Sequence, residues 1–264
     1  MRRPYCQKKS GLAIALGSIL ALGLFSLPSF ASNFNSNLRQ GLPGRRISGG
    51  SRSIGTACIA HPEQPIIALM PESNLGLTIS ARPTFWFAMP EVHQSKNIEF
   101  GIFNQNEELI YQKTFQPSGE AGITHFSLPE TEAALAIDQE YRWYLTVICD
   151  PSSRAEDLVV TGWVRRITPE SALVESLAEA TQQEQVALYQ DAELWHETIT
   201  QLADLYRNID PDSTASQTGT VEQQWNALLE AVNLPQVTET PFSNQSNLGL
   251  AVTLPASSHA SRPE

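Results

Sequence analysis

Hydrophobic and polar residues alternate along the first half of the chain, between about residues 65 and 167. In residues 98–102 and 141–149, apolar side chains occupy every second position, which is typical of strands that bury one face. Gly and Pro separate the short runs, as expected for an antiparallel sandwich of roughly seven strands. The pattern therefore predicts a β-sandwich domain over residues 58–167.

One pair of these strands is predicted to form a hairpin. Residues 104–107 are Asn, Gln, Asn and Glu, which favour a turn. Leu109, Tyr111 and Phe115 then continue the apolar pattern on one face. We therefore expect all three side chains in the core of the sandwich.

Residues 135–141 resemble the tyrosine corner of fibronectin-type sandwiches, with Tyr141 at the start of an alternating strand. Trp86 is expected on an early strand of such a fold. The antibody pattern is absent, because Val147 rather than a tyrosine stands two residues before Cys149. The sequence thus predicts a fibronectin/Ig-like sandwich.

After the last predicted strand, the period changes to that of helices. Residues 168–170 (Thr-Pro-Glu) are typical of a helix start, and residues 181–184 have the pattern of a capping box. Apolar residues at helical spacing predict a bundle of three to four helices over residues 168–234, so the fold class is α+β. Residues 235–264 have turn residues and little periodicity, which predicts a disordered tail.

Residues 1–31 have the layout of a secretory signal peptide. Four basic residues precede the uncharged run Gly11–Leu27, and small residues precede a cleavage site near Ala31. We therefore expect a periplasmic or secreted protein with no transmembrane segment after signal removal. A membrane anchor remains the alternative, because this 17-residue run reaches the lower limit for spanning a bilayer.

The net charge of the chain argues against two kinds of partner. Removal of the signal takes four of the 17 basic residues and none of the 28 acidic ones, so the net charge falls from −11 to −15. Nucleic acids and anionic membrane surfaces repel such a chain. We therefore expect no nucleic-acid partner.

Three cysteines are present, and Cys6 leaves with the signal. Cys58 and Cys149 remain, an even number in an oxidising compartment, which predicts a disulfide between them. Two buried free thiols are the alternative. A zinc site would need more ligands at close spacing.

Residues 32–57 are rich in Gly, Ser and Arg and contain no acidic residue, which predicts a flexible arm. The arm is either a solvated tether or a segment that docks on an acidic surface through Arg45, Arg46 and Arg52. Trp163 and Arg165 share one face of the last predicted strand and are a second candidate contact site. Alternatively, the helices cover that face, and Trp163 is core.

Candidate catalytic residues are scarce. His196 and Glu197 begin like the helix of a zinc protease, but Thr200 occupies the position of the second histidine. We therefore expect His196 to be a polar residue on the outer face of its helix. No nucleophile elbow, phosphate loop or dinucleotide fingerprint is present, so no catalytic, cofactor-binding or metal-binding residue is predicted.

The motifs taken together resemble a cyanobacterial family known only as domain of unknown function 928. The resemblance covers about residues 41–234 and implies an exported protein, but it supplies no catalytic residue. The motifs that carry it are 41–46 (GLPGRR), 49–52, Cys58, 69–71, Thr78, 83–87 (PTFWF) with Pro90, 122–123, 141–143 (YRW), 162–166 (GWVRR), 188–189, Trp195, 202–203, Trp225 and 228–229.

These observations favour a non-enzymatic exported module that binds an envelope or secreted protein and needs no cofactor. One alternative is a structural component of the envelope. Another is an exported hydrolase that uses dispersed carboxylates, which abundant acidic residues never exclude.

Overall fold

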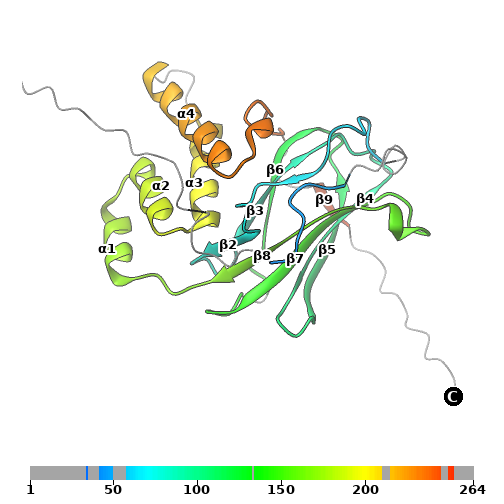
Figure 1. Ribbon diagram of the computed structural model, residues 1–264, viewed down its shortest axis with the longest axis horizontal. Helices are drawn as coiled ribbons and strands as arrows, with labels where there is room; N and C mark the ends of the chain where they lie inside the picture. Colours follow the sequence, from blue (N-terminus) through cyan, green and yellow to red (C-terminus); the bar gives the residue numbers. More distant parts are fainter. Residues whose placement is uncertain are drawn as a thin grey trace, which may run out of the picture.

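A computed structural model describes residues 34, 42–49, 58–132, 134–209, 215–244 and 249–252. Within them the chain forms two β-sheets and four α-helices, so the predicted α+β class is confirmed. The helices lie to one side of the sheets (Figure 1). The expected signal peptide (1–31) lies outside the described residues. The prediction of a disordered tail is wrong for residues 235–244 and 249–252, because the first segment bonds to Ile123 and the second forms a strand, while the rest of the tail lies outside the described residues.

The larger sheet has six strands in the order β2-β8-β7-β4-β5-β9, and the smaller sheet has three in the order β1-β3-β6. The bounds of the large-sheet strands are β2 (Leu75–Thr78), β8 (Leu158–Arg166), β7 (Glu140–Ile148), β4 (Asn97–Phe103), β5 (Leu109–Pro117) and β9 (Gly249–Val252). Those of the small sheet are β1 (Ile67–Ala68), β3 (Thr84–Met89) and β6 (Gly122–Ser127).

The prediction of a purely antiparallel sandwich is wrong at one edge, because β2 pairs with β8 in parallel. Parallel neighbours need a long crossover between them. Here the crossover contains β3 and β6 of the small sheet and β4, β5 and β7 of the large sheet. Strand β2 therefore pairs with a strand that lies far away in sequence.

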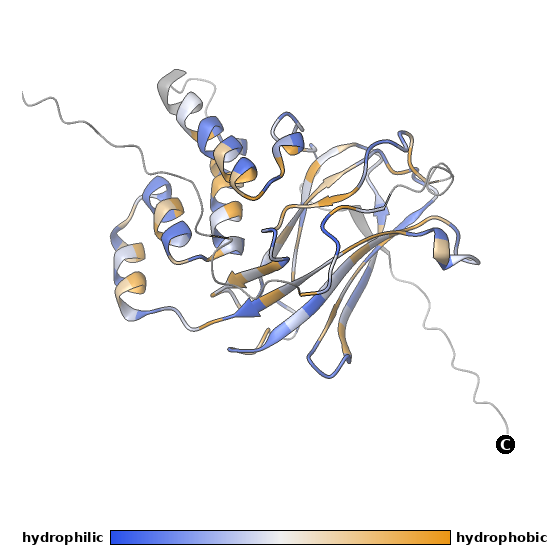
Figure 2. Ribbon diagram, viewed as in Figure 1, coloured by the Kyte–Doolittle hydropathy of each residue, from blue (hydrophilic) through white to orange (hydrophobic). Residues whose placement is uncertain are grey.

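Aromatic side chains pack the two sheets against each other. Phe85 of β3 lies 5.0 Å from the ring of Phe100 on β4, and Phe87 lies 5.8 Å from Trp143 on β7. All four side chains are buried. Burial of a large apolar side chain contributes roughly 2–3 kcal/mol, so these contacts form the centre of the core. Apolar and polar residues alternate along the long strands, as predicted (Figure 2).

The prediction that three side chains of the hairpin lie in the core is wrong for one of them. Tyr111 and Phe115 are buried as expected, but Leu109 is 46% exposed. A β-bulge explains the difference: Ile102 pairs with Tyr111 and its neighbour Phe103 pairs with Leu109, which leaves one extra residue on β5. The extra residue moves Leu109 off the core face.

The expected tyrosine corner makes its hydrogen bond. The hydroxyl of Tyr141, at the start of β7, accepts a hydrogen bond of 2.9 Å from the backbone N–H of Ala136. This bond fixes the chain where it enters β7. Trp86 lies on the early strand β3, as predicted, and is buried. Its side chain faces helix α3 instead of the other sheet.

The four helices are α1 (Ser171–Glu179), α2 (Gln182–Asp191), α3 (Trp195–Arg207) and α4 (Ala215–Ala231). Each packs on the next, and α3 also packs on β2 and β3, so the helices form a row that is attached to the sheets through α3. The predicted capping box of Thr181 and Glu184 is present at the start of α2. No helix in the described ranges is both long and apolar enough to cross a membrane.

Residues 42–49, where the sequence predicts a flexible arm, are held against both sheets. Arg45 pairs with Thr161 on the free part of the β8 edge, and Ile47 pairs with Ile67 on β1. The backbone of Ser48 also exchanges a hydrogen bond with Ile66. Backbone pairing is available here because β2 covers only the last four residues of β8.

The predicted disulfide is confirmed: Cys58 and Cys149 are bonded, with an S–S distance of 2.02 Å. Because Cys149 directly follows β7, the bond fastens the start of the domain to the end of that strand. The neighbouring Ile59 also pairs with Val92. Closing a loop of 91 residues contributes about 4–5 kcal/mol to stability on the chain-entropy model.

The two neighbouring arginines of the arm differ in their surroundings. The guanidinium of Arg46 donates hydrogen bonds to the carbonyls of Met70 (2.7 Å) and Val232 (2.8 Å), beyond the end of α4. Burial lowers the pKa of Arg46, and Glu72 partly offsets this. The side chain of Arg45 is exposed. Arg46 therefore ties the arm to the sheet and the helices.

We predict that Arg46→Ala lowers the free energy of unfolding by about 1–3 kcal/mol, because two carbonyls lose a charged donor. Arg45→Ala should change it by less than about 0.5 kcal/mol, because its side chain is solvated. Urea denaturation followed by tryptophan fluorescence measures both. Equal effects of the two substitutions would contradict the structural role of Arg46.

Candidate binding surface

The outer face of the six-stranded sheet carries a row of large side chains. Trp163 on β8 lies directly opposite Arg142 on β7, Arg142 opposite Phe103 on β4, and Phe103 opposite Leu109 on β5. Directly opposed residues project from the same face, with Cβ atoms about 5 Å apart. We call these four residues the outer row.

Contacts within the outer row hold its side chains in place. The guanidinium carbon of Arg142 lies 4.5 Å from the centre of the Phe103 ring, a cation–π contact. Arg142 also pairs with Glu107 in the β4–β5 turn. Leu109 and the extra residue Ile110 are 46% and 41% exposed, so the row ends in an apolar patch at the sheet edge.

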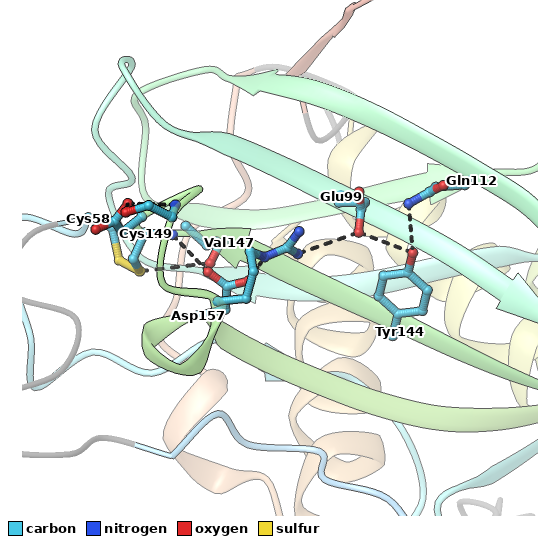
Figure 3. Close-up of polar contacts among 10 residues, drawn as sticks. Cys58, Glu99, Gln112, Tyr144, Val147, Cys149 and Asp157 are labelled. Atoms are coloured by element: carbon cyan, nitrogen blue, oxygen red, sulfur yellow. Dashed lines mark hydrogen bonds and ion pairs between the residues drawn. A yellow bond between two sulfur atoms is a disulfide. The ribbon is translucent and has the colours of Figure 1, made fainter. Parts of the chain in front are cut away.

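Tyr144, beside the outer row, lies over the backbone of Gly101. A Cβ atom at Gly101 would come within 2.3 Å of the tyrosine ring, so this approach requires glycine. The Tyr144 hydroxyl donates to Glu99 (3.1 Å) and accepts from Gln112 (3.2 Å) (Figure 3). Burial, followed by the charge of Glu99, raises the pKa of Tyr144. The phenol is therefore neutral and can donate to the carboxylate.

The polar contacts continue from Glu99 to the disulfide (Figure 3). Arg154 lies 3.7 Å from Glu99 and also pairs with Asp157. Asp157 accepts a hydrogen bond of 3.1 Å from the backbone N–H of Cys149. The hydrogen bond with Asp157 raises the pKa of Arg154. This chain of contacts fixes one side of the outer face to the disulfide.

Three of the predicted contact residues come together along β8. The indole N–H of Trp163 donates to the carbonyl of Pro43 (2.8 Å), so the arm, rather than the helices, half-covers this side chain. Arg165 lies two residues further on the same face, 3.7 Å from Asp138. Arg45 lies beside them through its pairing with Thr161.

The other two predicted arginines are not on this surface. Arg46 points into the protein, and Arg52 lies outside the described residues. Sequence reasoning also missed Phe103, Arg142 and Tyr144. Their signal was the alternation itself, because they occupy the outward positions between core residues.

The expectation that His196 lies on the outer face of its helix is wrong, because its side chain is 2% exposed. Its Nδ1 lies 2.9 Å from the carbonyl oxygen of Thr84, and its ring lies 5.1 Å from that of Phe85. Gly76 leaves the space that the imidazole occupies, since a Cβ there would lie 2.6 Å from Nε2. Helix α3 can therefore insert its first turn between β2 and β3.

Glu197 holds the same turn to the end of β2. One carboxylate oxygen accepts hydrogen bonds from the Thr78 hydroxyl (2.6 Å) and from the N–H groups of Ile79 and Ser80 (both 3.0 Å). Burial raises the pKa of Glu197, and these hydrogen bonds partly offset that effect. Thr200, which replaces the second zinc-protease histidine, accepts a bond from the Trp86 indole. The residues that resemble part of a zinc-protease motif, His196, Glu197 and Thr200, thus attach α3 to the sheets.

Comparison with known proteins identifies one family. The family described as Domain of Unknown Function (DUF928) matches residues 47–242. The chain belongs to the DUF928 family. No curated protein and no solved structure matches it.

The first and last residues of the DUF928 region both make contacts within the fold. The region starts at Ile47, which pairs with β1, and ends at Phe242, whose ring lies 6.0 Å from Trp86 and 5.2 Å from Trp225. Both sheets and all four described helices lie within it, apart from β9. The family region therefore contains most of the packed unit, and residues 42–46 and β9 pack beside it. Among the residues that the structure describes, it contains no group of three or more side chains able to hold a metal ion.

Two histidines, buried His196 and half-buried His125, are expected to make the stability of this DUF928 protein depend on pH. Burial lowers the pKa of His196 to about 4, and burial with the nearby charge of Arg207 lowers that of His125 to about 4. His125 lies 4.6 Å from the ring of Trp86, whose indole bonds to Thr200 of α3. Both groups are neutral in the fold and take up protons on unfolding. They stabilise the fold fully above pH 6.5, and this stabilisation is lost as the pH falls to 4.

We predict that the free energy of unfolding falls between pH 6.5 and 4 by roughly 1.4 kcal/mol per pH unit for each histidine. The raised pKa of Glu197 works in the opposite direction. His125→Gln should flatten the profile, whereas the exposed His93→Gln should leave it unchanged. Urea denaturation at a series of pH values measures the slopes, and a wild-type profile that is flat in this range would refute the prediction.

Proposed function

We propose that this DUF928 protein is an exported, non-enzymatic module that binds an envelope or secreted protein through the outer row. One observation carries the proposal: Trp163, Arg142, Phe103 and Leu109 project from the solvent-facing side of four adjacent strands. Large side chains at these positions add nothing to the core between the sheets. Binding to a partner explains why such large side chains occupy these outward positions.

The composition of the surface supports a protein as its partner. Aromatic residues and arginine are enriched among the side chains that contribute most to protein–protein binding. Exposed Leu109 and Ile110 extend the surface with apolar area that a partner would cover. The cation–π contact of Arg142 and the hydrogen bonds of Tyr144 limit the conformational entropy lost on binding.

Export is supported by the basic and apolar pattern of residues 1–31 and by the Cys58–Cys149 bond. Disulfides persist in the periplasm and in secreted proteins. We also propose that the two sheets form a distant fibronectin/Ig-like sandwich. The corner bond of Tyr141 and the buried Trp143 favour this relationship.

Affinity capture from the envelope and medium of the organism that encodes the protein tests the proposal. We expect one stoichiometric partner, identified by cross-linking and mass spectrometry. With that partner purified, Phe103→Ala should weaken binding by at least about 30-fold, as expected for a central contact residue worth about 2 kcal/mol.

Matched controls come from exposed apolar residues elsewhere. Ile137 and Val174 are 46% and 50% exposed and lie outside the outer row, so Ile137→Ala and Val174→Ala should leave the dissociation constant unchanged. Circular dichroism verifies that each variant is folded. Recovery of self-cross-links alone would favour a structural envelope component, and equal weakening by all three variants would exclude the outer row as the interface.

A further inference from the structure

A groove of about 560 Å³ lies on the outer side of the three-stranded sheet. Its floor includes Ile67 of β1 and Ala88 and Met89 of β3. One wall is the segment 236–241 that follows α4, and the other comes from residues 63–65 and Ile47. This volume falls in the range of small-molecule sites, about 300–1,000 Å³.

The walls of the groove are held in place by backbone hydrogen bonds. The N–H of Ile123 on β6 donates to the carbonyl of Pro241 (2.8 Å), and the N–H of Ser243 donates to the carbonyl of Ile123 (2.9 Å). On the opposite side, Ile47 is paired with Ile67. Pro65, Pro90 and Pro241 also line the groove and restrict its backbone. The cavity is therefore preformed, which lowers the entropy lost on binding.

The polar groups of the groove favour a ligand that donates hydrogen bonds and carries positive charge. Among the described residues, its charged side chains are Glu63 and Glu239, and no Lys, Arg or His lines it. The three prolines have no backbone N–H to offer an anion. Exposed His61, which lies 3.5 Å from Glu63, is outside the lining.

We propose that this groove binds a small amphiphilic cation, with the apolar part of the ligand over Ile67, Ala88 and Met89 and its positive charge beside Glu63 and Glu239. The apolar floor supplies the area that desolvates the ligand, and the carboxylates select the sign of its charge. The groove belongs to the small sheet, so the proposal is independent of binding at the outer row.

Isothermal titration calorimetry with three octyl amphiphiles below their micelle-forming concentrations tests the proposal on the purified protein. The probes are octyltrimethylammonium, octyl glucoside and octyl sulfate, which share a tail and differ in charge. We expect octyltrimethylammonium to bind with a dissociation constant of about 1 mM or lower. The neutral and anionic probes should bind at least about fivefold more weakly. Equal affinities for the three, or no binding of the cation, would overturn the proposal.

Variants locate the binding site. Glu63→Gln with Glu239→Gln should weaken cation binding by about fivefold to tenfold, and Ala121→Trp at the exposed rim should abolish it by filling the groove. The exposed residues Glu130 and Glu156, changed together to Gln, and Ala155→Trp are matched controls outside the groove. Loss of binding in the controls, or its retention in both groove variants, would place the cation elsewhere and overturn the proposal.

Discussion

The first turn of helix α3 joins the helices to both sheets, and the arrangement of the whole protein depends on its buried hydrogen bonds. Trp195 donates to the carbonyl of Leu69, His196 contacts the carbonyl of Thr84 on β3, and Glu197 accepts from Thr78 on β2. Buried polar groups without partners are costly, so each bond restricts how the turn can be placed. Helices α2 and α4 pack on α3, and α1 packs on α2, so the positions of the other helices depend on α3.

The outer faces of the two sheets therefore differ. On the small sheet, Trp86 is covered by α3 through Thr200, and by Phe242 beyond the last helix. On the large sheet, α3 reaches the β2 edge, and within the described part of the chain no helix packs on the faces of β4, β5 and β7 (Figure 1). The position of one helix thus covers part of the outer face of the small sheet, around Trp86, and leaves the outer row of the large sheet uncovered by helices.

Local periodicity was sufficient to predict the core strands and the start of α2, because alternation and capping depend on residues close in sequence. It could not predict the parallel pairing of β2 with β8, or the burial of His196, which needs the space left by Gly76 on a distant strand. The different surroundings of Arg45 and Arg46 likewise depend on partners more than 100 residues away. Two residues of the candidate surface, Trp163 and the neighbouring Arg165, could be predicted from one strand. Phe103, Arg142 and Tyr144 follow the alternation of β4 and β7, whereas the bulge hid Leu109, because an insertion in one strand changes the face of the residues beyond it.

The arm also determines the order in which the protein can be completed. Arg45 bonds to a residue 116 positions later, and Arg46 to one 186 positions later. Closing such long loops is slow, because chain entropy is lost before the contact forms. The contacts of Arg45 and Arg46 must therefore wait for β8 and the end of α4, whereas Ile47 can pair with β1, only 20 residues later, much sooner. Until then the part of the β8 edge beside Thr161 stays open.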